Sequence, residues 1–319
     1  MVVKARGYVD FIFCDKPFTT KSELWSYRAK NTNTSIKYVT YWCQQNIDHF
    51  QDIARLNSVK LPQLKVSDTD DYYLPLPPRE VQDKIVEILD TLAALCENLD
   101  TEIAQREQQF TVYREKLLSV DYMTTQSGTE GVKYARLGDV AVRQRGTAIT
   151  ATKMKELDTP SGEVRVFAAG STEAKIEKDK LPQTSIHTEP SMVVKARGYI
   201  DFIYYDAPFT TKSELWSYRA GDGNTSIKYV TCWAQQNVDH FQNTARLNGV
   251  KLPQLKVSDT DDYRLPLPSR KVQDEVVAKL DAMQELIDNL RLERKQRQQQ
   301  FNYYREILLS FPKKNTAEV

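Results

Sequence analysis

The sequence predicts a mixed α/β fold, in which globular α+β domains are joined to two long helices that form an antiparallel coiled-coil spacer. Three observations lead to this prediction. The chain repeats itself, each copy contains short β-rich runs and an amphipathic helix, and each copy ends in a long apolar heptad pattern. Helical and strand patterns within one unit favour an α+β domain over an all-helical bundle.

The chain of 319 residues is an internal repeat. When Met1 is aligned with Met192, 63 of the first 77 positions are identical, and the match continues without a gap to the endings YREKLLS and YREILLS. A unit of this length excludes a short-period solenoid. Residues 120–191 precede the second copy and have no counterpart before the first. The first copy is therefore predicted to be the back part of a domain whose complete form is the second copy.

Each copy ends in a long stretch without glycine or proline. A helix of about 40 residues would be about 60 Å long, and it cannot bury an apolar stripe alone. We expect the two helices to pair antiparallel within the chain, with pairing to another chain as the alternative. The predicted seam positions keep heptad spacing, which is typical of coiled coils. They are Val81, Ile85, Ile88, Leu92, Leu95, Leu99, Phe110, Tyr113 and Leu117 in the first copy, and Val272, Val276, Leu280, Met283, Ile287, Leu290, Phe301, Tyr304 and Leu308 in the second.

The globular part of each copy mixes helix and strand. Apolar residues from Ile227 to Ala245 recur every three or four positions, which predicts one amphipathic helix. The runs VVKARGYIDFIYY and EVRVFAAG are rich in β-forming residues and are predicted strands. The expected domains are the end of a first globular domain at 1–78, a long helix at 79–119, a linker at 120–133, a complete second globular domain at 134–268, a second long helix at 269–311 and a tail at 312–319.

The composition of the chain restricts the classes of protein to which it can belong. The mean hydropathy is −0.56 and no apolar stretch has the length of a membrane span, so no membrane association is expected. The amino terminus lacks the features of a signal peptide, which predicts a cytoplasmic protein. Cys14 and Cys43 are replaced by Tyr205 and Ala234 in the second copy, so they are expected to pack rather than bind metal. The net charge of +1 means that any nucleic-acid binding must use a local basic patch or be shared with a partner.

The sequence contains none of the common catalytic motifs. The sequence has no phosphate-binding loop, no dinucleotide fingerprint, no HExxH and no GxSxG. The run SDTDDY, at Ser67 and again at Ser258, gathers aspartates, but its spacing favours turns and helix caps over a cation site. The chain is therefore predicted not to be an enzyme and to bind neither a cofactor nor a metal.

The most basic segment runs from Lys133 to Lys155. It carries six basic residues and one acidic residue within 23 positions, and threonines lie between them. Gly146 would allow close backbone approach, and threonine hydroxyls suit phosphates or base edges. Two further candidates are the loop-like runs FTTKSELW and NGVKLPQLK. The alternatives are a solvated charged face for the first segment and simple packing for the third. The candidate DNA contacts are Arg143, Arg145, Thr147, Lys153, Lys195, Arg197, Thr211, Lys212, Lys251 and Lys256.

The order of these motifs resembles one family. A domain that opens with RLGDVAVRQRG, ends with RLNGVKLPQLKVSDTDDYRLPLPSRK and is followed by a long helix closing in QQFNYYREILLS is similar to the specificity subunit of type I restriction-modification systems. Gln82 and Gln273 lie at equivalent positions near the starts of the two long helices. The resemblance covers essentially the whole chain, but family members usually begin with a full first recognition domain.

The resemblance implies two target-recognition domains, each reading one half of a bipartite double-stranded DNA sequence, held apart by the antiparallel helices. It implies partner modification subunits, which bind S-adenosylmethionine and methylate adenine, and restriction subunits that cut DNA. The chain itself is expected to supply specificity only. The runner-up is a truncated or decoy subunit that acts mainly as an assembly scaffold for methyltransferase subunits. A homodimer, in which two chains supply two complete domains, is a further option.

Overall fold

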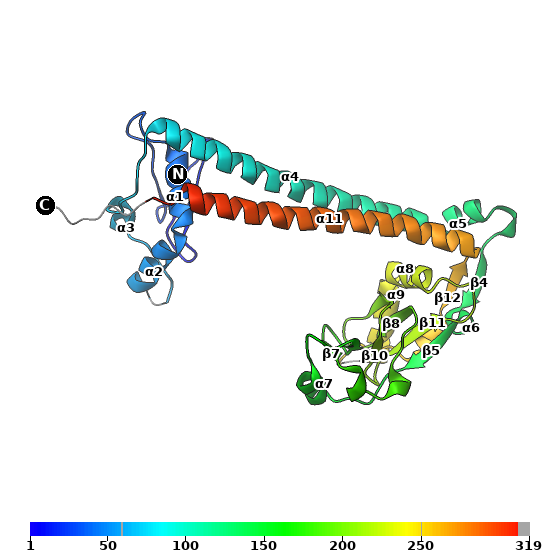
Figure 1. Cartoon of the computed structure of the whole chain (residues 1–319). Helices are drawn as coiled ribbons and strands as arrows, with labels where there is room; N and C mark the ends of the chain where they lie inside the picture. The colour runs from blue at the N-terminus through cyan, green and yellow to red at the C-terminus, as the bar shows by residue number, and fades with distance from the viewer. Residues whose placement is uncertain (59, 250, 312–319) are drawn as a thin grey trace. The chain divides into compact units, whose positions relative to one another are not determined.

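The computed structural model describes residues 1–58, 60–249 and 251–311, and the predicted tail at 312–319 lies outside them. The chain divides into two compact units (Figure 1). Unit 1 comprises Met1–Gln105 and Ile287–Val319, and unit 2 comprises Arg106–Leu286. Each of the two long helices therefore begins in one unit and ends in the other.

Unit 1 contains a small antiparallel sheet covered by helices. Its three strands lie in the order β2-β1-β3. The apolar core lies between this sheet and the helices, with Phe11 of β2 packed edge to face against Phe50 of α2. The elements are β1 Val2–Lys4, β2 Asp10–Ile12, β3 Trp25–Ser26, α1 Ile36–Gln45, α2 Ile47–Asn57, α3 Val66–Asp70 and the first part of α4 Arg79–Leu117.

Unit 2 is built on a four-stranded antiparallel sheet. The strand order is β5-β11-β8-β9, and helices α8 and α9 share the main apolar core with it. A second sheet, ordered β10-β6-β7, has its own small core around Met154 of α7, and β12 pairs with β4. The elements are α5 Val120–Ser127, β4 Lys133–Arg136, α6 Leu137–Val140, β5 Ala141–Arg145, α7 Ala151–Leu157, β6 Val164–Phe167, β7 Glu173–Ile176, β8 Ser191–Lys195, β9 Asp201–Tyr205, β10 Phe209–Thr211, β11 Trp216–Ala220, α8 Ile227–Gln236, α9 Val238–Asn248, α10 Val257–Asp261, β12 Arg264–Leu267 and the first part of α11 Arg270–Leu308, with short 3₁₀ turns at Gly128–Glu130, Lys178–Lys180 and Gln183–Ser185.

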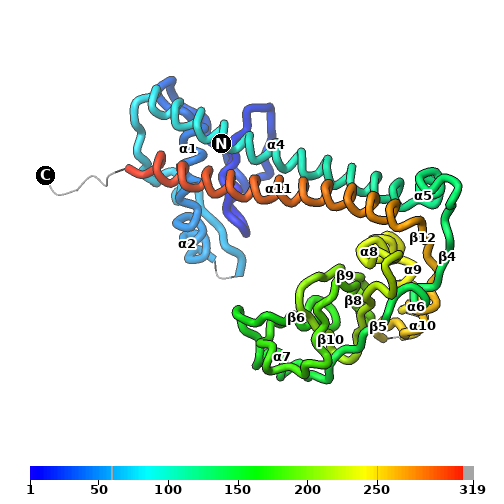
Figure 2. Tube along the Cα trace, turned by 45° about the vertical axis from the view of Figure 1, so that its right-hand side comes forward, coloured from blue at the N-terminus to red at the C-terminus, as the bar shows by residue number. Residues whose placement is uncertain are grey.

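The predicted fold class, with its two long antiparallel helices, is confirmed. Helices α4 and α11 lie side by side in both views (Figure 2). In unit 1 the start of α4 meets the end of α11, where Ile85 and Leu89 share a core with Leu308 and Leu309. Nearer the middle of both helices, Arg294 donates two hydrogen bonds to the Asp100 carboxylate at 2.9 and 3.0 Å. In unit 2 the end of α4 meets the start of α11, and Leu117 shares a core with Val276 and Leu280.

The buried face of α4 differs from the predicted seam. The buried apolar residues are Ile85, Leu89, Leu92, Cys96 and Leu117, whereas the predicted positions Val81, Ile88 and Leu95 are exposed. The predicted and observed rows share Ile85, Leu92 and Leu117, but between residues 81 and 96 they lie on neighbouring faces of the helix. On α11 the predicted positions Val272, Val276, Leu280 and Ile287 are buried, and Tyr304 is exposed.

Two local predictions also need correction. The single helix expected from Ile227 to Ala245 is two helices, α8 and α9, which meet at Asn237 with φ −108° and ψ 23°. The Asn237 side chain donates to the Trp233 carbonyl oxygen at 2.8 Å and so caps α8. The run VVKARGYIDFIYY forms two strands, β8 and β9, rather than one, because Gly198 adopts a φ of +82° that turns the chain.

The equivalent glutamines of the two copies attach each long helix to its own domain. Gln273 is completely buried in the first turn of α11. Its Oε1 accepts the Ser226 N–H at 2.8 Å, and its Nε2 donates to the carbonyl oxygens of Pro268 at 2.8 Å and Asn224 at 3.0 Å. Gln82 makes the same three contacts in unit 1. One amide side chain thereby satisfies three backbone groups that would otherwise be buried without partners.

Candidate DNA interface

The turn between β8 and β9 presents the first of the predicted DNA contacts. The N–H of Gly198 donates to the Pro253 carbonyl oxygen at 2.8 Å. The N–H of Leu255 donates to the Ala196 carbonyl oxygen, also at 2.8 Å. These bonds fix the turn against the loop that follows α9, and they leave the side chain of Arg197 exposed at this end of the sheet.

The loop that follows α9 adds two lysines and an amide. Lys251, Gln254 and Lys256 are exposed. Arg197 and Gln254 form an antiparallel bridge, so this loop runs directly beside the turn. Lys256 precedes α10, where the Asp259 carboxylate accepts its N–H at 2.7 Å. The SDTDDY run thus caps a helix, as the sequence favoured.

Lys212 reaches the same region from β10. Its N–H donates to the Phe167 carbonyl oxygen at 2.8 Å, and its Nζ lies 2.9 Å from a carboxylate oxygen of Glu214. Burial alone would raise the pKa of Glu214, but the hydrogen bond from Lys212 and the charges of Lys212 and Arg197 lower it overall. The positive charges of Lys212 and Arg197 therefore both favour the ionised form of the Glu214 carboxyl.

Arg145 is the last residue of β5, and its side chain is exposed. The next residue, Gly146, lies so close to β10 that a Cβ atom would be 2.4 Å from the carbonyl oxygens of Thr211 and Lys212. The N–H of Thr147 donates to the Thr211 carbonyl oxygen at 2.7 Å. The close backbone approach that Gly146 permits is therefore made by the protein's own strand β10. This approach brings the end of β5, with Arg145, toward Lys212.

Five of the ten predicted contacts therefore gather from separate segments of unit 2. We call them the basic loop group. All five carry a positive charge, and the loops that hold them are fixed by backbone hydrogen bonds rather than by the charged side chains. The group consists of Arg145, Arg197, Lys212, Lys251 and Lys256.

Three predicted contacts are buried in unit 2. Thr147 and Thr211 are buried between β5, β10 and β11. Lys195 donates from its ammonium group to the carbonyl oxygens of Ala168 at 2.8 Å and Gly170 at 2.9 Å. Burial lowers the pKa of Lys195. Because all three side chains are buried, the structure does not favour them as phosphate contacts.

The last two predicted contacts form ion pairs outside the group. The Nε of Arg143 lies 3.7 Å from a carboxylate oxygen of Asp261. The Nζ of Lys153 lies 3.4 Å from a carboxylate oxygen of Glu156 on the same helix. In the part of the chain that the structure describes, no hydrogen bond or ion pair joins Arg143 or Lys153 to the basic loop group.

Gln254 was missed among the predicted contacts. It lies between the two lysines of its loop, and its amide group carries both a donor and an acceptor. Such a group can make a bidentate contact to adenine in the major groove. The run NGVKLPQLK pointed to this loop, but only its two lysines were predicted as contacts.

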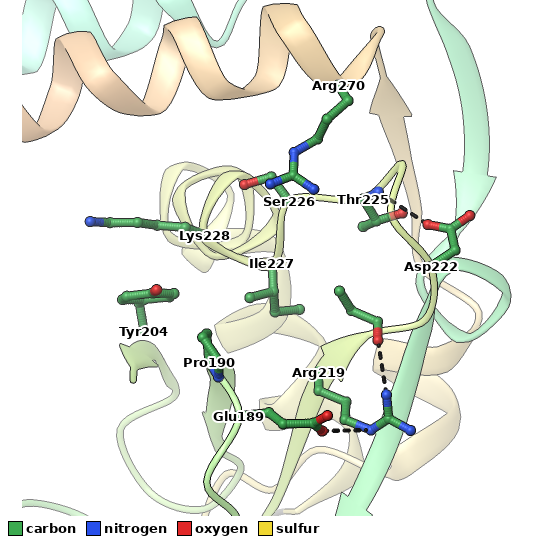
Figure 3. A pocket seen from close by; sticks show the side chains of 11 residues that line it. Glu189, Pro190, Tyr204, Arg219, Asp222, Thr225, Ser226, Ile227, Lys228 and Arg270 are labelled. Atoms are coloured by element: carbon green, nitrogen blue, oxygen red, sulfur yellow. Dashed lines mark hydrogen bonds and ion pairs between the residues drawn. The ribbon is translucent and has the colours of Figure 1, made fainter. Parts of the chain in front are cut away.

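A separate pocket of about 350 Å³ lies in unit 2 where β11 and α8 approach the start of α11. Figure 3 shows Arg219 directed at Glu189, with 3.0 Å between Nε and a carboxylate oxygen. Arg270 donates to the Gly223 carbonyl oxygen at 3.0 Å. Both guanidinium groups are thus engaged by the protein, and we interpret the pocket as a structural junction between the domain and its helix.

Comparison with known families identifies the chain. The family model for the "Type I restriction modification DNA specificity domain" matches residues 7–107 and 129–300, which is most of the sequence. The chain belongs to the type I restriction-modification specificity-subunit family. Membership makes it a specificity subunit, which is a non-catalytic component. Among the described residues, no helix has both the length and the apolar composition that crossing a membrane requires.

Curated relatives and solved structures agree with this assignment. A type I restriction enzyme specificity subunit of Escherichia coli is 24% identical over 98% of this chain and 79% of its own length. A putative specificity subunit of Haemophilus influenzae is 26% identical over 81% of this chain and 66% of its own length. The crystal structure of a specificity subunit from M. genitalium has the same fold, with a TM-score of 0.62 at 13% identity, covering 88% of this chain and 74% of that one.

Proposed function

We propose that this specificity subunit reads one half of a bipartite double-stranded DNA sequence with the basic loop group of unit 2. Partner modification subunits would then methylate adenine at the chosen site, and partner restriction subunits would cut unmethylated DNA. The gathering of five cationic residues from separate chain segments supports the proposal. Phosphate contacts position a protein on DNA, and neighbouring polar groups such as Gln254 can read base edges.

The domain boundaries predicted from the sequence are part of this proposal. The predicted second recognition domain at 134–268 lies within the bounds of unit 2, and the part of a first recognition domain predicted at 1–78 lies within those of unit 1. The helices at 79–119 and 269–311 would serve as the spacer that separates the two half-sites. The near-neutral net charge is compatible with this role because modification subunits can share the phosphate contacts.

The salt dependence of DNA binding tests the interface. Replacing Arg197 with alanine in the complex with modification subunits should flatten the plot of log affinity against log salt by about 0.9 if it contacts one phosphate. If a member of the group reads a base instead, its loss should cost about 1 to 3 kcal/mol at one position of the target.

Lys195→Met is the matched control. It removes one positive charge only two residues away, but from a buried side chain, so the salt slope should not change once folding is verified. Equal slopes for Arg197→Ala and the unmodified subunit, or a flattened slope for Lys195→Met, would place the DNA surface elsewhere.

Unit 1 should read its half-site weakly. It keeps the equivalents Arg6, Lys21, Lys60 and Lys65. The stretch that corresponds to β10 forms no strand in unit 1, so Lys21 is not fixed as Lys212 is. With modification subunits present, we expect a footprint mainly on the side of unit 2. A two-part motif with unrelated halves, read by a single chain, would contradict this expectation.

The scaffold alternative and a homodimer give different results in the same experiment. A scaffold without recognition would assemble with modification subunits but leave no sequence-specific footprint. A homodimer that supplies two complete domains would produce a nearly palindromic bipartite motif in methylation sequencing, because both halves would be read by the same unit 2 residues.

A further inference from the structure

A cavity of about 510 Å³ lies in unit 2, bordered by α8, by β9 and by the adjoining parts of α4 and α11. This volume falls within the range of about 300 to 1,000 Å³ that is usual for small-molecule pockets. Every residue that lines the cavity belongs to unit 2, and none is a member of the basic loop group. Phe110 of α4, Cys232 of α8 and Asp281 of α11 are among the lining residues. The cavity is therefore a feature of one unit and is separate from the candidate DNA interface.

Unit 1 shows which side chain fills the equivalent space. The ring of Tyr41 packs against the ring of Phe301, with 6.4 Å between their centroids, and the Tyr41 hydroxyl donates to Oδ1 of Asp90 at 2.7 Å. The alignment of the two copies gives each of these three residues a counterpart that lines the cavity of unit 2. The pairs of counterparts are Tyr41 and Cys232, Phe301 and Phe110, and Asp90 and Asp281. Unit 2 therefore keeps the aromatic ring and the carboxylate that contact the tyrosine, but a small thiol replaces the phenol.

The carboxylate of Asp281 has an unused acceptor at the cavity. Its Oδ2 accepts a hydrogen bond from Lys228 at 2.7 Å, as Oδ2 of Asp90 accepts one from Lys37 at 2.7 Å. In the part of the chain that the structure describes, no hydrogen bond reaches Oδ1 of Asp281, which corresponds to the oxygen that binds Tyr41. Hydrogen bonds from an O–H group to a carboxylate are short and strong. The carboxylate of Asp281 is therefore suited to bind a hydroxyl group from outside the chain.

A second hydrogen bond of unit 1 is also missing beside the cavity. In unit 1, Nε of Arg305 donates to Oε1 of Gln45 at 2.8 Å. The counterparts in unit 2 are Nε of Arg114 and Oε1 of Gln236, and both atoms are buried without a hydrogen-bond partner among the described residues. Gln236 lies one helical turn after Cys232 on α8. Buried polar atoms normally have partners, so the contact between α4 and α8 is incomplete where the tyrosine ring is lacking.

The Cys232 thiol is not suited to covalent chemistry. Burial raises the pKa of Cys232 to about 11, so the thiol stays protonated near neutral pH. The thiolate is the form of cysteine that acts as a nucleophile or binds a metal. The cavity is therefore suited to noncovalent binding of a ring that packs against Phe110 and donates to Asp281.

We propose that this cavity binds a small phenol in the position that the Tyr41 ring takes in unit 1. The ring of the phenol packs against Phe110 beside Cys232, and its hydroxyl donates to Oδ1 of Asp281. The bound molecule contacts α4, α8 and α11 together, so it strengthens the attachment of the globular part of unit 2 to its long helices. The argument rests on the comparison of the two copies and not on the DNA-binding residues.

Titration of the purified full-length subunit with phenol tests the proposal. We expect a single saturable site by isothermal titration calorimetry, together with slower amide exchange in α8 when phenol is bound. Benzene has the same ring without the hydroxyl. It should bind at least about tenfold more weakly, because it makes no hydrogen bond to the Asp281 carboxylate.

Two substitutions exchange the residues of the two copies at this position. Cys232→Tyr should fill the cavity and abolish phenol binding, whereas Cys232→Ala, which only removes the thiol, should keep it. Tyr41→Cys should open the equivalent space in unit 1, next to Phe301 and Asp90, so that this variant binds a second phenol. Circular dichroism would verify that each variant is folded, and Tyr41→Cys tests the proposal even if Cys232→Tyr does not fold.

Several results would overturn the proposal. Absence of saturable phenol binding to the unmodified subunit would mean that water alone fills the cavity. Unchanged binding in folded Cys232→Tyr would place the phenol elsewhere, and a folded Tyr41→Cys variant without a second site would show that unit 1 is not the template. Equal affinities for phenol and benzene would exclude the hydrogen bond to Asp281. None of these measurements involves DNA, so failure of the recognition proposal would be seen separately.

Discussion

Replacing Leu92 with glutamate should destabilise unit 1 by more than about 3 kcal/mol. The Leu92 side chain is 9% exposed on the buried face of α4. Burial of a leucine side chain stabilises a protein by about 1.5 to 3 kcal/mol, and a carboxylate in its place adds a desolvation cost. Thermal and urea unfolding of the purified subunit would measure the effect, and recovery of modification subunits on the variant would show whether assembly fails with it.

Leu95→Glu provides the matched control for that substitution. Leu95 was predicted to belong to the same seam, but it is 40% exposed. A charge at such a position should change the free energy of unfolding by no more than about 0.5 kcal/mol. Equal destabilisation by both substitutions would mean that the buried face of α4 is wider than the structure shows.

Gln273→Leu should destabilise unit 2 by about 3 kcal/mol or more. Leucine has a similar size but leaves the Ser226 N–H and the carbonyl oxygens of Asn224 and Pro268 without their partner. Each buried polar group that loses its partner costs about 1 to 3 kcal/mol. Chemical unfolding would report the loss, and amide exchange at the start of α8 should accelerate with it.

Gln299→Leu is the control for this prediction because Gln299 is exposed on the same helix. Its replacement should leave the free energy of unfolding unchanged within about 0.5 kcal/mol. Gln82→Leu should reproduce the effect of Gln273→Leu in unit 1, since the three contacts are the same. If Gln273→Leu were as mild as Gln299→Leu, water would have to replace the lost amide at the junction.

The sequence predicts the long helices closely but not the face that they bury. The helix expected at 79–119 is Arg79–Leu117 in the structure, because a stretch free of glycine and proline leaves little choice of boundary. The seam was misassigned because two neighbouring apolar rows of α4 share Ile85 and Leu92. Periodicity alone cannot decide between such rows, and the second helix decides it by packing on one of them.

The candidate DNA interface could be predicted only in part for a related reason. Arg197 and Lys195 are two residues apart in a hairpin, and charge makes both of them candidates. The fold of segment 133–190 places Lys195 beneath the carbonyl groups of Ala168 and Gly170, whereas Arg197 lies on the turn that follows β8. That segment lies nearby only in the folded domain, so local sequence cannot reveal which of the two side chains it will bury.

The way in which the turn between β8 and β9 is held has a consequence for evolution. The bonds from Gly198 to Pro253 and from Leu255 to Ala196 join main-chain atoms. The backbone of both loops would therefore survive substitution of the side chains that point away from it, among them those at positions 197, 251 and 254. Variants with new residues at these positions would still fold. The target DNA sequence of the subunit could therefore change during evolution without loss of the domain's fold.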